Sequence, residues 1–485
     1  MTDMSSPPVS PRSRRDFVRR AGGLALGGLA GRAGLGLGLA GLAALSSRAS
    51  RSANPGGGYR ALVCLFMLGG NDAHNWFVPI DPAEHAAYAA ARGDLALPLA
   101  ALQSPAGLVQ DGRRFGTPAE LAPLMRWYEQ GRAAVVANVG PLVRPLTRAE
   151  FLAERDVPAK LFSHNDQVST WQSLSPEGAR AGWGGRIADL LMAANAQPLF
   201  TAVSAAGNAV FLSGRDVVQY QIGANGAARV RALDERWVTG SSTVGALLRE
   251  TLVTAGDHPM AGEYARVMAR SIAAEGVLSS AFGRVSVPPI PATPILGGAP
   301  LPTGSPATLD VDPLARQLSV VAQMIAAAPA LGLQRQVFMV SLGAFDTHAN
   351  QLRDHPVLTA RVALSIDYFM GALQSLGLLD AVTLFTASDF GRTLVSNGDG
   401  SDHGWGAHHV VLGGGVRGGQ IHGRFPVVAT GTPDDVGSGR LLPGLSVVEL
   451  AAQFGGWMGL SPAEQAEVLP GLSAFGQRMA PLMTA

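Results

Sequence analysis

The feature that most constrains the fold of this chain is a set of five short apolar runs separated by helical patterns. The runs occupy residues 61–68, 133–139, 336–342, 381–386 and 409–412. A continuous apolar run of this length is typical of a strand that is buried on both faces of a parallel sheet. The segments between them, such as 314–331 and 360–378, carry the apolar spacing of helices. Strands that alternate with helices predict an α/β fold with a central, mostly parallel sheet and helices on both faces.

Three of these runs lead into an aspartate. Asp72 follows the first run, Asp346 the third and Asp389 the fourth. The carboxyl ends of parallel strands meet at one edge of a sheet, and ligands bind there in α/β folds. The spacing therefore predicts that the three carboxylates gather at one site.

Histidines concentrate in the same part of the chain. Six of the ten lie between His348 and His422, and two of them follow an aspartate closely, at Asp346-x-His348 and Asp402-His403. Carboxylate oxygen and imidazole nitrogen are ligands of zinc, manganese and iron. We therefore expect one or two divalent metal ions at this edge. The alternative is that the aspartates cap helices and the histidines line loops.

The first 49 residues carry the pattern of an export signal. Arg14 and Arg15 are followed by the apolar pair Phe17 and Val18 and by a basic residue, which is the twin-arginine pattern. The glycine-rich stretch 21–45 is too weakly apolar for a membrane anchor. We expect the twin-arginine translocase as a partner and a periplasmic or secreted protein. An uncleaved anchor or a chance pair of arginines is the alternative.

Composition limits the remaining partners. A formal net charge of +1 gives no sign of nucleic acid as a partner. No later stretch reaches membrane-spanning length without a charge or a glycine, so the mature chain is expected to have no membrane span. The single cysteine, Cys64, excludes an intrachain disulfide. We predict one domain over residues 55–485, with a proline- and glycine-rich loop at about 285–310.

Several motifs identify the chain with a known family. They are Gly69-Gly70-Asn71-Asp72-x-x-Asn75, Phe345-Asp346-Thr347-His348-x-x-Gln351, Ser388-Asp389-Phe390-Gly391-Arg392-Thr393, Asn397 and Asp402-His403-Gly404-Trp405-Gly406, with glycines at 413–419. In this order they resemble the DUF1501 family, a group of exported bacterial proteins without an assigned activity. That family in turn resembles the alkaline phosphatase-like fold of phosphatases, sulfatases and cofactor-independent phosphoglycerate mutases.

The resemblance implies roles for individual residues. The implied metal ligands are Asp72, Asp346, His348, Asp389 and His403. Ser163, at a helix start, would be the nucleophile, and Arg392 would steady the anionic group. Asn75 and His164 would contact the substrate. Three alternatives stay open: Ser163 as a helix N-cap, Arg392 in a structural salt bridge, and Asn75 as an ordinary loop asparagine.

One departure from the superfamily pattern affects the metal count. The superfamily commonly has a histidine directly after the aspartate of the fourth strand, whereas Phe390 follows Asp389 here. A phenylalanine cannot ligate, so one metal site lacks an imidazole unless His164 or Asp402 supplies a ligand. A site with one metal, or a site that has lost catalysis, fits as well as a site with two.

The leading hypothesis is an exported metal-dependent hydrolase of phosphate or sulfate esters, whose partner is a small anionic ester. The alternative is a non-catalytic exported protein that binds an envelope polymer or carbohydrate on a degenerate scaffold. An exported redox enzyme is a third reading. It has little support, because residues 69–72 lack the spacing of a dinucleotide-binding glycine loop.

Overall fold

The computed structural model describes residues 57–484 except positions 225, 227–229, 235–237, 239, 257 and 477. These residues belong to one compact unit that spans 52–485. The expected twin-arginine signal lies outside the described residues, so the signal, its boundary and the export pathway stay predictions.

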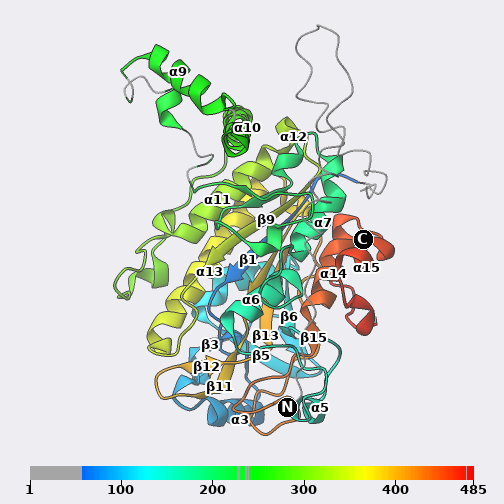
Figure 1. Cartoon of the computed structure of the whole chain (residues 1–485). Coiled ribbons are helices and arrows are strands. Elements are labelled where there is room, and N and C mark those ends of the chain that lie inside the picture. The colour runs from blue at the N-terminus through cyan, green and yellow to red at the C-terminus, as the bar shows by residue number, and fades with distance from the viewer. Residues whose placement is uncertain are drawn as a thin grey trace, which may run out of the picture. The chain divides into compact units, whose positions relative to one another are not determined.

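A nine-stranded sheet runs through the centre of the unit (Figure 1). Its order is β14–β6–β13–β10–β1–β9–β7–β8, with β15 also paired to β6. The strands are β1 (Arg60–Met67), β6 (Ala133–Gly140), β7 (Ala202–Ser204), β8 (Tyr220–Gln221), β9 (Arg335–Leu342), β10 (Val382–Ser388), β13 (Ala407–Gly413), β14 (Ile421–His422) and β15 (Leu445–Ser446). Each of the five predicted apolar runs forms one of these strands.

Only strand β13 runs against the common direction among the described strands of this sheet. It pairs antiparallel with β10 and with β6, whereas the other pairings are parallel. The prediction of an α/β fold with a mostly parallel central sheet is therefore confirmed. The direction of β13 also matters for the site, because its first residue lies at the edge where its parallel neighbours end.

Both faces of the sheet are buried, and strand β1 shows how. Its alternate side chains enter two different cores, Ala61, Val63, Leu65 and Met67 on one side and Leu62, Cys64 and Phe66 on the other. Helices α11 (Pro313–Ala326) and α13 (Gln351–Ser375) cover the first face, and α7 (Trp183–Leu191) and α14 (Val447–Met458) cover the second (Figure 1). Burial on both faces is why the run carries no polar alternation.

The other helices begin and end where local sequence signals place them. Helix α11 starts after Asp312, whose carboxylate accepts the backbone N–H groups of Leu314 (2.8 Å) and Ala315 (3.2 Å). The remaining helices are α3 (Pro82–Arg92), α4 (Ala122–Glu129), α5 (Arg148–Leu152), α6 (His164–Ser173), α9 (Ser242–Val253), α10 (Pro259–Phe282), α12 (Ala328–Leu331) and α15 (Pro462–Val468).

Helix α13 is the one described helix that is long and apolar enough to cross a membrane. Most of its apolar window, 72%, is buried inside the unit, as in a core helix. The proline- and glycine-rich stretch lies against it, because Ile295 and Leu309 pack with Val357 and Ala360 of α13. That stretch carries short 3-10 turns at Ile295–Gly298 and Leu309–Val311.

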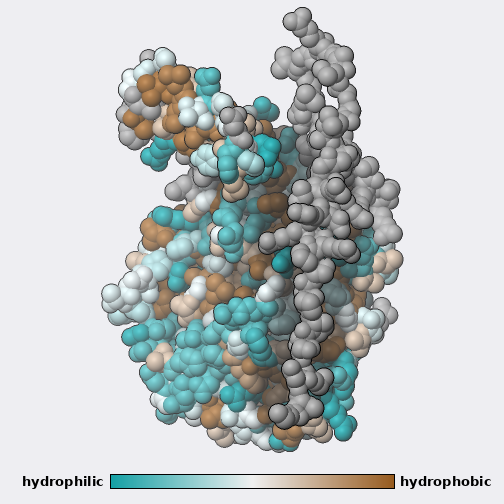
Figure 2. All heavy atoms as spheres, viewed as in Figure 1, coloured by the Kyte–Doolittle hydropathy of each residue, from teal (hydrophilic) through white to brown (hydrophobic). Residues whose placement is uncertain are grey.

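Two smaller sheets and a helical hairpin complete the unit. Strands β2 (Val78–Pro79), β3 (Leu102–Gln103) and β4 (Val109–Gln110) all pair with β5 (Arg113–Pro118). Strands β11 (Arg392–Ser396) and β12 (Ser401–His403) form a separate antiparallel ribbon. Helices α9 and α10 form the hairpin, and Figure 2 shows apolar side chains gathered on it. Its exposed side chains include Leu247, Met260 and Tyr264.

A candidate metal centre at the carboxyl edge of the sheet

Strand register brings the polar segments to one edge. Met67 at the end of β1 pairs with Ser388 of β10 and with Leu342 of β9, so the residues that follow all three strands leave the sheet together. Strand β13 starts at this edge, since its first residue, Ala407, pairs near the end of β6. The β11–β12 ribbon comes just before β13 and places His403 over the same edge.

Two glycines after β1 let these segments approach closely. Gly69 has a φ of +117°, and a Cβ there would lie 2.4 Å from the backbone nitrogen of Asp346. Gly70 has a φ of +89°, and a Cβ there would lie 2.5 Å from the Phe390 ring. Any other residue would be strained and would push apart the loops that carry Asp346 and Phe390.

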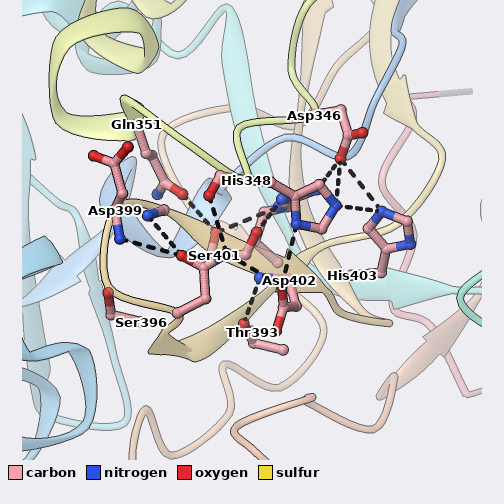
Figure 3. A network of polar contacts seen from close by, with 12 residues as sticks. Asp346, His348, Gln351, Thr393, Ser396, Asp399, Ser401, Asp402 and His403 are labelled. Carbon is pink, nitrogen blue, oxygen red and sulfur yellow. Dashed lines mark hydrogen bonds and ion pairs between the residues drawn. The ribbon is translucent and has the colours of Figure 1, made fainter.

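Three histidines converge on the carboxylate of Asp346. Asp346 Oδ1 lies 3.1 Å from His348 Nε2 and 3.3 Å from His403 Nε2, and these two nitrogens are 2.9 Å apart (Figure 3). His164 Nε2 lies 3.4 Å from Asp346 Oδ2. We call Asp346, His348, His403 and His164 the His/Asp cluster.

The other nitrogen of each imidazole is held by an acceptor. His403 Nδ1 lies 2.7 Å from the carbonyl oxygen of Phe162, and His348 Nδ1 lies 3.1 Å from Asp402 Oδ1. His164 Nδ1 lies 2.7 Å from Asp389 Oδ2. Because each acceptor takes the Nδ1–H, each neutral ring presents the Nε2 lone pair to the cluster. Metal-binding histidines have this same arrangement of one nitrogen bound to an acceptor and the other to the ion.

The cluster fits a divalent metal ion. Ligand atoms of His164, Asp346 and His403 all lie within 4.8 Å of one another. Zinc binds nitrogen at about 2.0–2.1 Å, so two ligands of a tetrahedral ion are about 3.4 Å apart. The separations given above, from 2.9 to 3.4 Å, are close to this value. Three imidazoles and one carboxylate suit zinc, manganese or iron.

Neighbouring groups set the charge states of the cluster. Partial burial acts to raise the pKa of Asp346, but the hydrogen bond and charge of Arg392 outweigh it and hold that pKa below its ordinary value. Desolvation lowers the pKa of His403. The hydrogen bond that His164 donates to Asp389 raises the pKa of His164, which favours its protonated form. Asp346 is thus kept as an anion and His403 as a neutral ring, which are the forms that bind metal.

Arg392 contacts the His/Asp cluster through a hydrogen bond to Asp346. Its side chain is fully buried, and Nη1 donates to Asp346 Oδ1 (2.7 Å) and to the carbonyl of Gly69 (3.2 Å). Nε donates to Ser401 Oγ (3.3 Å) and Nη2 to the carbonyl oxygen of Ser401. With every nitrogen engaged, Arg392 positions Asp346, and its predicted contact with an anionic substrate finds no support in this geometry.

Asp389 contacts the His/Asp cluster through His164. Its Oδ1 accepts the backbone N–H of Gly69 (3.0 Å) and its Oδ2 accepts His164 Nδ1 (2.7 Å). Both carboxylate oxygens are therefore used in fixing His164 and the loop after β1. The structure places His164, predicted as a substrate contact, among the candidate ligands, and Asp389 as the group that orients it.

Asp72 is placed outside the His/Asp cluster. Its carboxylate is fully buried and forms an ion pair with Arg92 of α3, with a further hydrogen bond from Gln351. Desolvation acts to raise the pKa of Asp72, but the charges of Arg92, His355 and His74 and the hydrogen bond from Arg92 together hold that pKa below its ordinary value. The ion pair engages Asp72 through Oδ2, whereas Oδ1 has no hydrogen-bond partner among the described residues, so the metal role of Asp72 stays a prediction. The sequence did not reveal the ion pair, because Arg92 lies 20 residues further along.

Hydrogen bonds link this ion pair to the cluster. Gln351 Nε2 donates to Asp72, and Gln351 Oε1 accepts the hydroxyl of Ser401 (2.6 Å). The Ser401 hydroxyl oxygen in turn accepts a hydrogen bond from Arg392 Nε, and Arg392 Nη1 donates to Asp346. Gln351 and Ser401 received no role in the sequence analysis, although Gln351 closes one of the family motifs. Sequence proximity could have indicated both residues, because Gln351 lies three residues after His348 and Ser401 lies two residues before His403.

Asn75 and Ser163 are bound to internal partners. The amide of Asn75 donates to the carbonyl of Leu95 (2.9 Å) and accepts the Tyr88 hydroxyl (2.8 Å), so each of its polar atoms has a partner inside the protein. Ser163 stands at the N-cap position of α6, but its hydroxyl makes no bond with the helix backbone. It donates instead to Asp166 Oδ2 at 2.9 Å.

Asp402 and Phe390 contribute contacts that sequence reasoning did not assign. Asp402 holds His348, and it also accepts the side-chain amide of Asn397 (3.3 Å). The Phe390 ring packs against two imidazoles, with its centroid 4.9 Å from that of His164 and 4.5 Å from that of His403. The two imidazoles also contact each other edge-on, with centroids 4.4 Å apart, so the three rings form one aromatic group.

A cavity of about 530 Å³ opens beside the cluster. His164 and Asp389 lie in its wall together with Gly69, Asn165 and Glu177, and Leu68, Val168 and Val210 supply apolar surface. Ser163 is not part of this wall. The cavity can hold the organic part of a small molecule whose polar group reaches His164.

Comparisons with known proteins give a family and a distant structural likeness. The model of the family described as "Protein of unknown function (DUF1501)" matches residues 59–466. No curated protein matches the chain. Matching solved structures include the PsFucS1 sulfatase from Pseudoalteromonas sp., with a TM-score of 0.31 and 10% identity, covering 90% of this chain and 75% of that one. The structure of Ps i-CgsB matches with a TM-score of 0.33 and 11% identity, covering 86% and 76%. Scores of this size support no inference about activity.

Proposed function

We propose that this chain, which belongs to the DUF1501 family, is a metal-dependent hydrolase of phosphate or sulfate esters. The family match over residues 59–466 confirms the resemblance that the motifs predicted. One observation carries the proposal: three imidazoles, each held at Nδ1 by an acceptor, aim their Nε2 atoms at the single carboxylate of Asp346. A divalent ion among these atoms would accept the Nε2 lone pairs and balance the charge of Asp346.

The chain's own residues define how such a site would work. A bound divalent ion would supply Lewis-acid polarisation of an ester oxygen and would lower the pKa of a nucleophile. Asp346 balances positive charge, while Asp402, Asp389 and the carbonyl of Phe162 fix the imidazoles. The cavity beside His164 and Asp389 receives the organic part of the ester, and the Phe390 ring packs against the imidazoles of His164 and His403.

Ser163 is the proposed nucleophile. Its hydroxyl already donates to the Asp166 carboxylate, which would take the proton as Oγ bonds to phosphorus or sulfur and the bond to the leaving oxygen breaks. The leaving oxygen takes a proton from water, and a second water then cleaves the serine ester. Because Ser163 does not cap α6 with its side chain, the first backbone N–H groups of that helix remain to favour the anionic group.

Substitution of this hydroxyl tests the assignment. We expect Ser163→Ala to lower kcat for an aryl phosphate or aryl sulfate by about a hundredfold, since water must replace the hydroxyl as nucleophile. The matched control is Ser173→Ala, which removes a hydroxyl of the same helix that donates to the backbone carbonyl of Ser169 (2.7 Å) and lies outside the cavity wall. Steady-state turnover of both variants is the measurement. An unchanged kcat for Ser163→Ala would exclude it as nucleophile and leave water in that role.

A second candidate function is binding without turnover. One observation favours it: Arg392, the arginine expected to steady an anion, has all its nitrogens bound to protein groups. A binding protein would keep its metal and its ligand but hydrolyse neither aryl phosphate nor aryl sulfate. Wild-type turnover above the rate of a metal-stripped sample separates the two functions.

We also propose that the protein is exported by the twin-arginine pathway to the periplasm or beyond. The support is the pair Arg14 and Arg15 with its apolar followers. We expect Arg14→Lys with Arg15→Lys to leave the precursor in the cytoplasm, because the translocase reads the arginine pair itself. Cell fractionation and immunoblotting measure this, and Arg19→Lys in the same segment is the control. Normal export of the double variant would contradict the pathway.

A further inference from the structure

A second polar cavity lies away from the His/Asp cluster. It is a groove of about 990 Å³ beside β14, between the β4–β5 hairpin, the segment that follows β6, and the segment that runs from Pro433 to Leu445. Four arginines line it: Arg148, Arg417, Arg424 and Arg478. We call this cavity the arginine groove.

Three of these guanidinium groups are anchored in the same way. One nitrogen of each donates to a backbone carbonyl: Arg148 Nε to Asp435 at 2.7 Å, Arg417 Nε to Met483 at 3.3 Å, and Arg478 Nη2 to Gly444 at 2.5 Å. Both Nη atoms of Arg148 and of Arg417, and Nη1 of Arg478, have no partner among the described residues. Anchoring fixes the orientation of each group and lowers the entropy lost when it binds an anion.

The acidic groups around the groove do not neutralise it. Asp434 is occupied by Arg424, whose Nη1 lies 3.0 Å from Asp434 Oδ2. Glu449 is buried, with its pKa raised by desolvation, and lies 3.8 Å from Arg478. Asp111 is the other carboxylate in the wall. The groove thus concentrates positive charge in a chain whose formal net charge is only +1.

Size and lining indicate the kind of ligand. A groove of this volume exceeds a single sulfate or phosphate ion many times over, and its arginines come from three separate segments of the chain. The wall contains no tryptophan, tyrosine or phenylalanine. Single-stranded nucleic acids are held largely by stacking on such rings, so they are disfavoured. Guanidinium groups bind sulfate and phosphate oxygens bidentately, without a need for stacking.

The groove and the candidate metal centre share one segment of the chain. Pro433, Asp434 and Leu442 line the groove. Between them, Arg440 Nε donates to the carbonyl oxygen of His403 (3.0 Å). Gly439 accepts the backbone N–H of Leu394 in β11 (3.1 Å). One short segment therefore separates the groove from the ribbon that carries His403.

We propose that the arginine groove binds an anionic glycan, a polysaccharide chain that carries sulfate or phosphate groups. The glycan would be the substrate class of the proposed hydrolase, and that identification rests on the proposed function. The binding itself does not rest on it, because binding in the groove needs no metal. The chain would be held by Arg148, Arg417 and Arg478 while an ester further along it reaches the His/Asp cluster.

Binding of dextran sulfate in the presence of EDTA tests the proposal, with neutral dextran and inorganic sulfate as reference ligands. We expect the variant with Arg148, Arg417 and Arg478 all changed to Gln to bind dextran sulfate on the order of 100-fold more weakly than wild type. The matched control changes Arg266, Arg270 and Arg353 to Gln. These three are exposed, with side-chain exposures of 69%, 70% and 58%, and lie outside the groove. The control should bind within about threefold of wild type.

Four outcomes would overturn the proposal: equal binding by the groove variant, an equal loss in the control, equal binding of neutral dextran, or tighter binding of single-stranded DNA than of dextran sulfate. Thermal unfolding at the wild-type temperature shows that the groove variant is folded. Failure here is distinct from failure of the hydrolase, because turnover of a small aryl ester does not require the groove and glycan binding under EDTA does not require the metal.

Discussion

We expect that changing Asp346 to Asn removes the metal ion proposed for the His/Asp cluster. The amide keeps the shape of the side chain but loses the negative charge and one strong ligand, while the three imidazoles remain in place. We expect about one equivalent of zinc, manganese or iron in wild-type protein and less than about a tenth of that in the variant, with affinity lowered at least about 100-fold. Metal content by plasma mass spectrometry and competition with a chelator measure both quantities.

Two further variants make this result decisive. Asp399→Asn has the same chemistry on an exposed carboxylate in the turn between β11 and β12, and it should keep the metal. His403→Gln should lose the metal without disturbing Arg392, whose bond to Asp346 is retained. Wild-type protein that takes up none of the three metals, or two cluster variants that retain wild-type metal, would contradict a metal centre at this place.

The second large effect concerns stability and the fully buried pair of Arg92 and Asp72. Arg92→Met keeps most of the side-chain volume but leaves the Asp72 carboxylate buried without its counter-ion. We expect the free energy of unfolding to fall by about 3–5 kcal/mol, because an unpaired charge in the interior is costly. Urea denaturation measures the loss. The matched control is Arg114→Met, which breaks an exposed pair with Asp81 and should cost less than about 1 kcal/mol.

A double variant separates the charge from the packing. Adding Asp72→Asn to Arg92→Met removes the stranded carboxylate and should restore most of the lost stability. If the double variant is as unstable as the single one, the loss comes from packing and the ion-pair argument fails. In wild type the pKa of Asp72 is depressed, so the pair stabilises the fold at pH values above the ordinary aspartate pKa. That contribution is lost as the pH falls through the depressed value.

The sheet could be predicted because each of its main strands is recognisable from its own local sequence. A run such as 336–342 is apolar throughout, and only a strand covered on both faces uses such a sequence. The convergence of Asp346 and His348 on one edge followed from the same rule, as did the place of His403 ahead of β13. These residues needed no knowledge of side-chain direction, because the ends of neighbouring strands fix where their loops begin.

The roles of Asp72, Asp389 and Arg392 could not be predicted in the same way. Each lies at the expected edge, but its role depends on which atoms a distant segment brings to it. Arg92 arrives from α3, Gly69 offers its N–H to Asp389, and Asp346 takes a nitrogen of Arg392. Such partners are set by loop conformation, here by the two glycines with positive φ, and no pattern of spacing reports that conformation.

The ribbon of β11 and β12 bears on how such a protein can change over generations. The ribbon supplies His403, Asp402, Ser401 and Arg392, yet its two strands are not among the nine strands of the central sheet. The ribbon therefore carries one of the three imidazoles of the cluster, the carboxylate that holds His348 and the arginine that holds Asp346, all outside the main scaffold. A lineage can lose or rebuild that stretch while the sheet continues to fold, so inheritance of the fold and inheritance of the reaction are separate events.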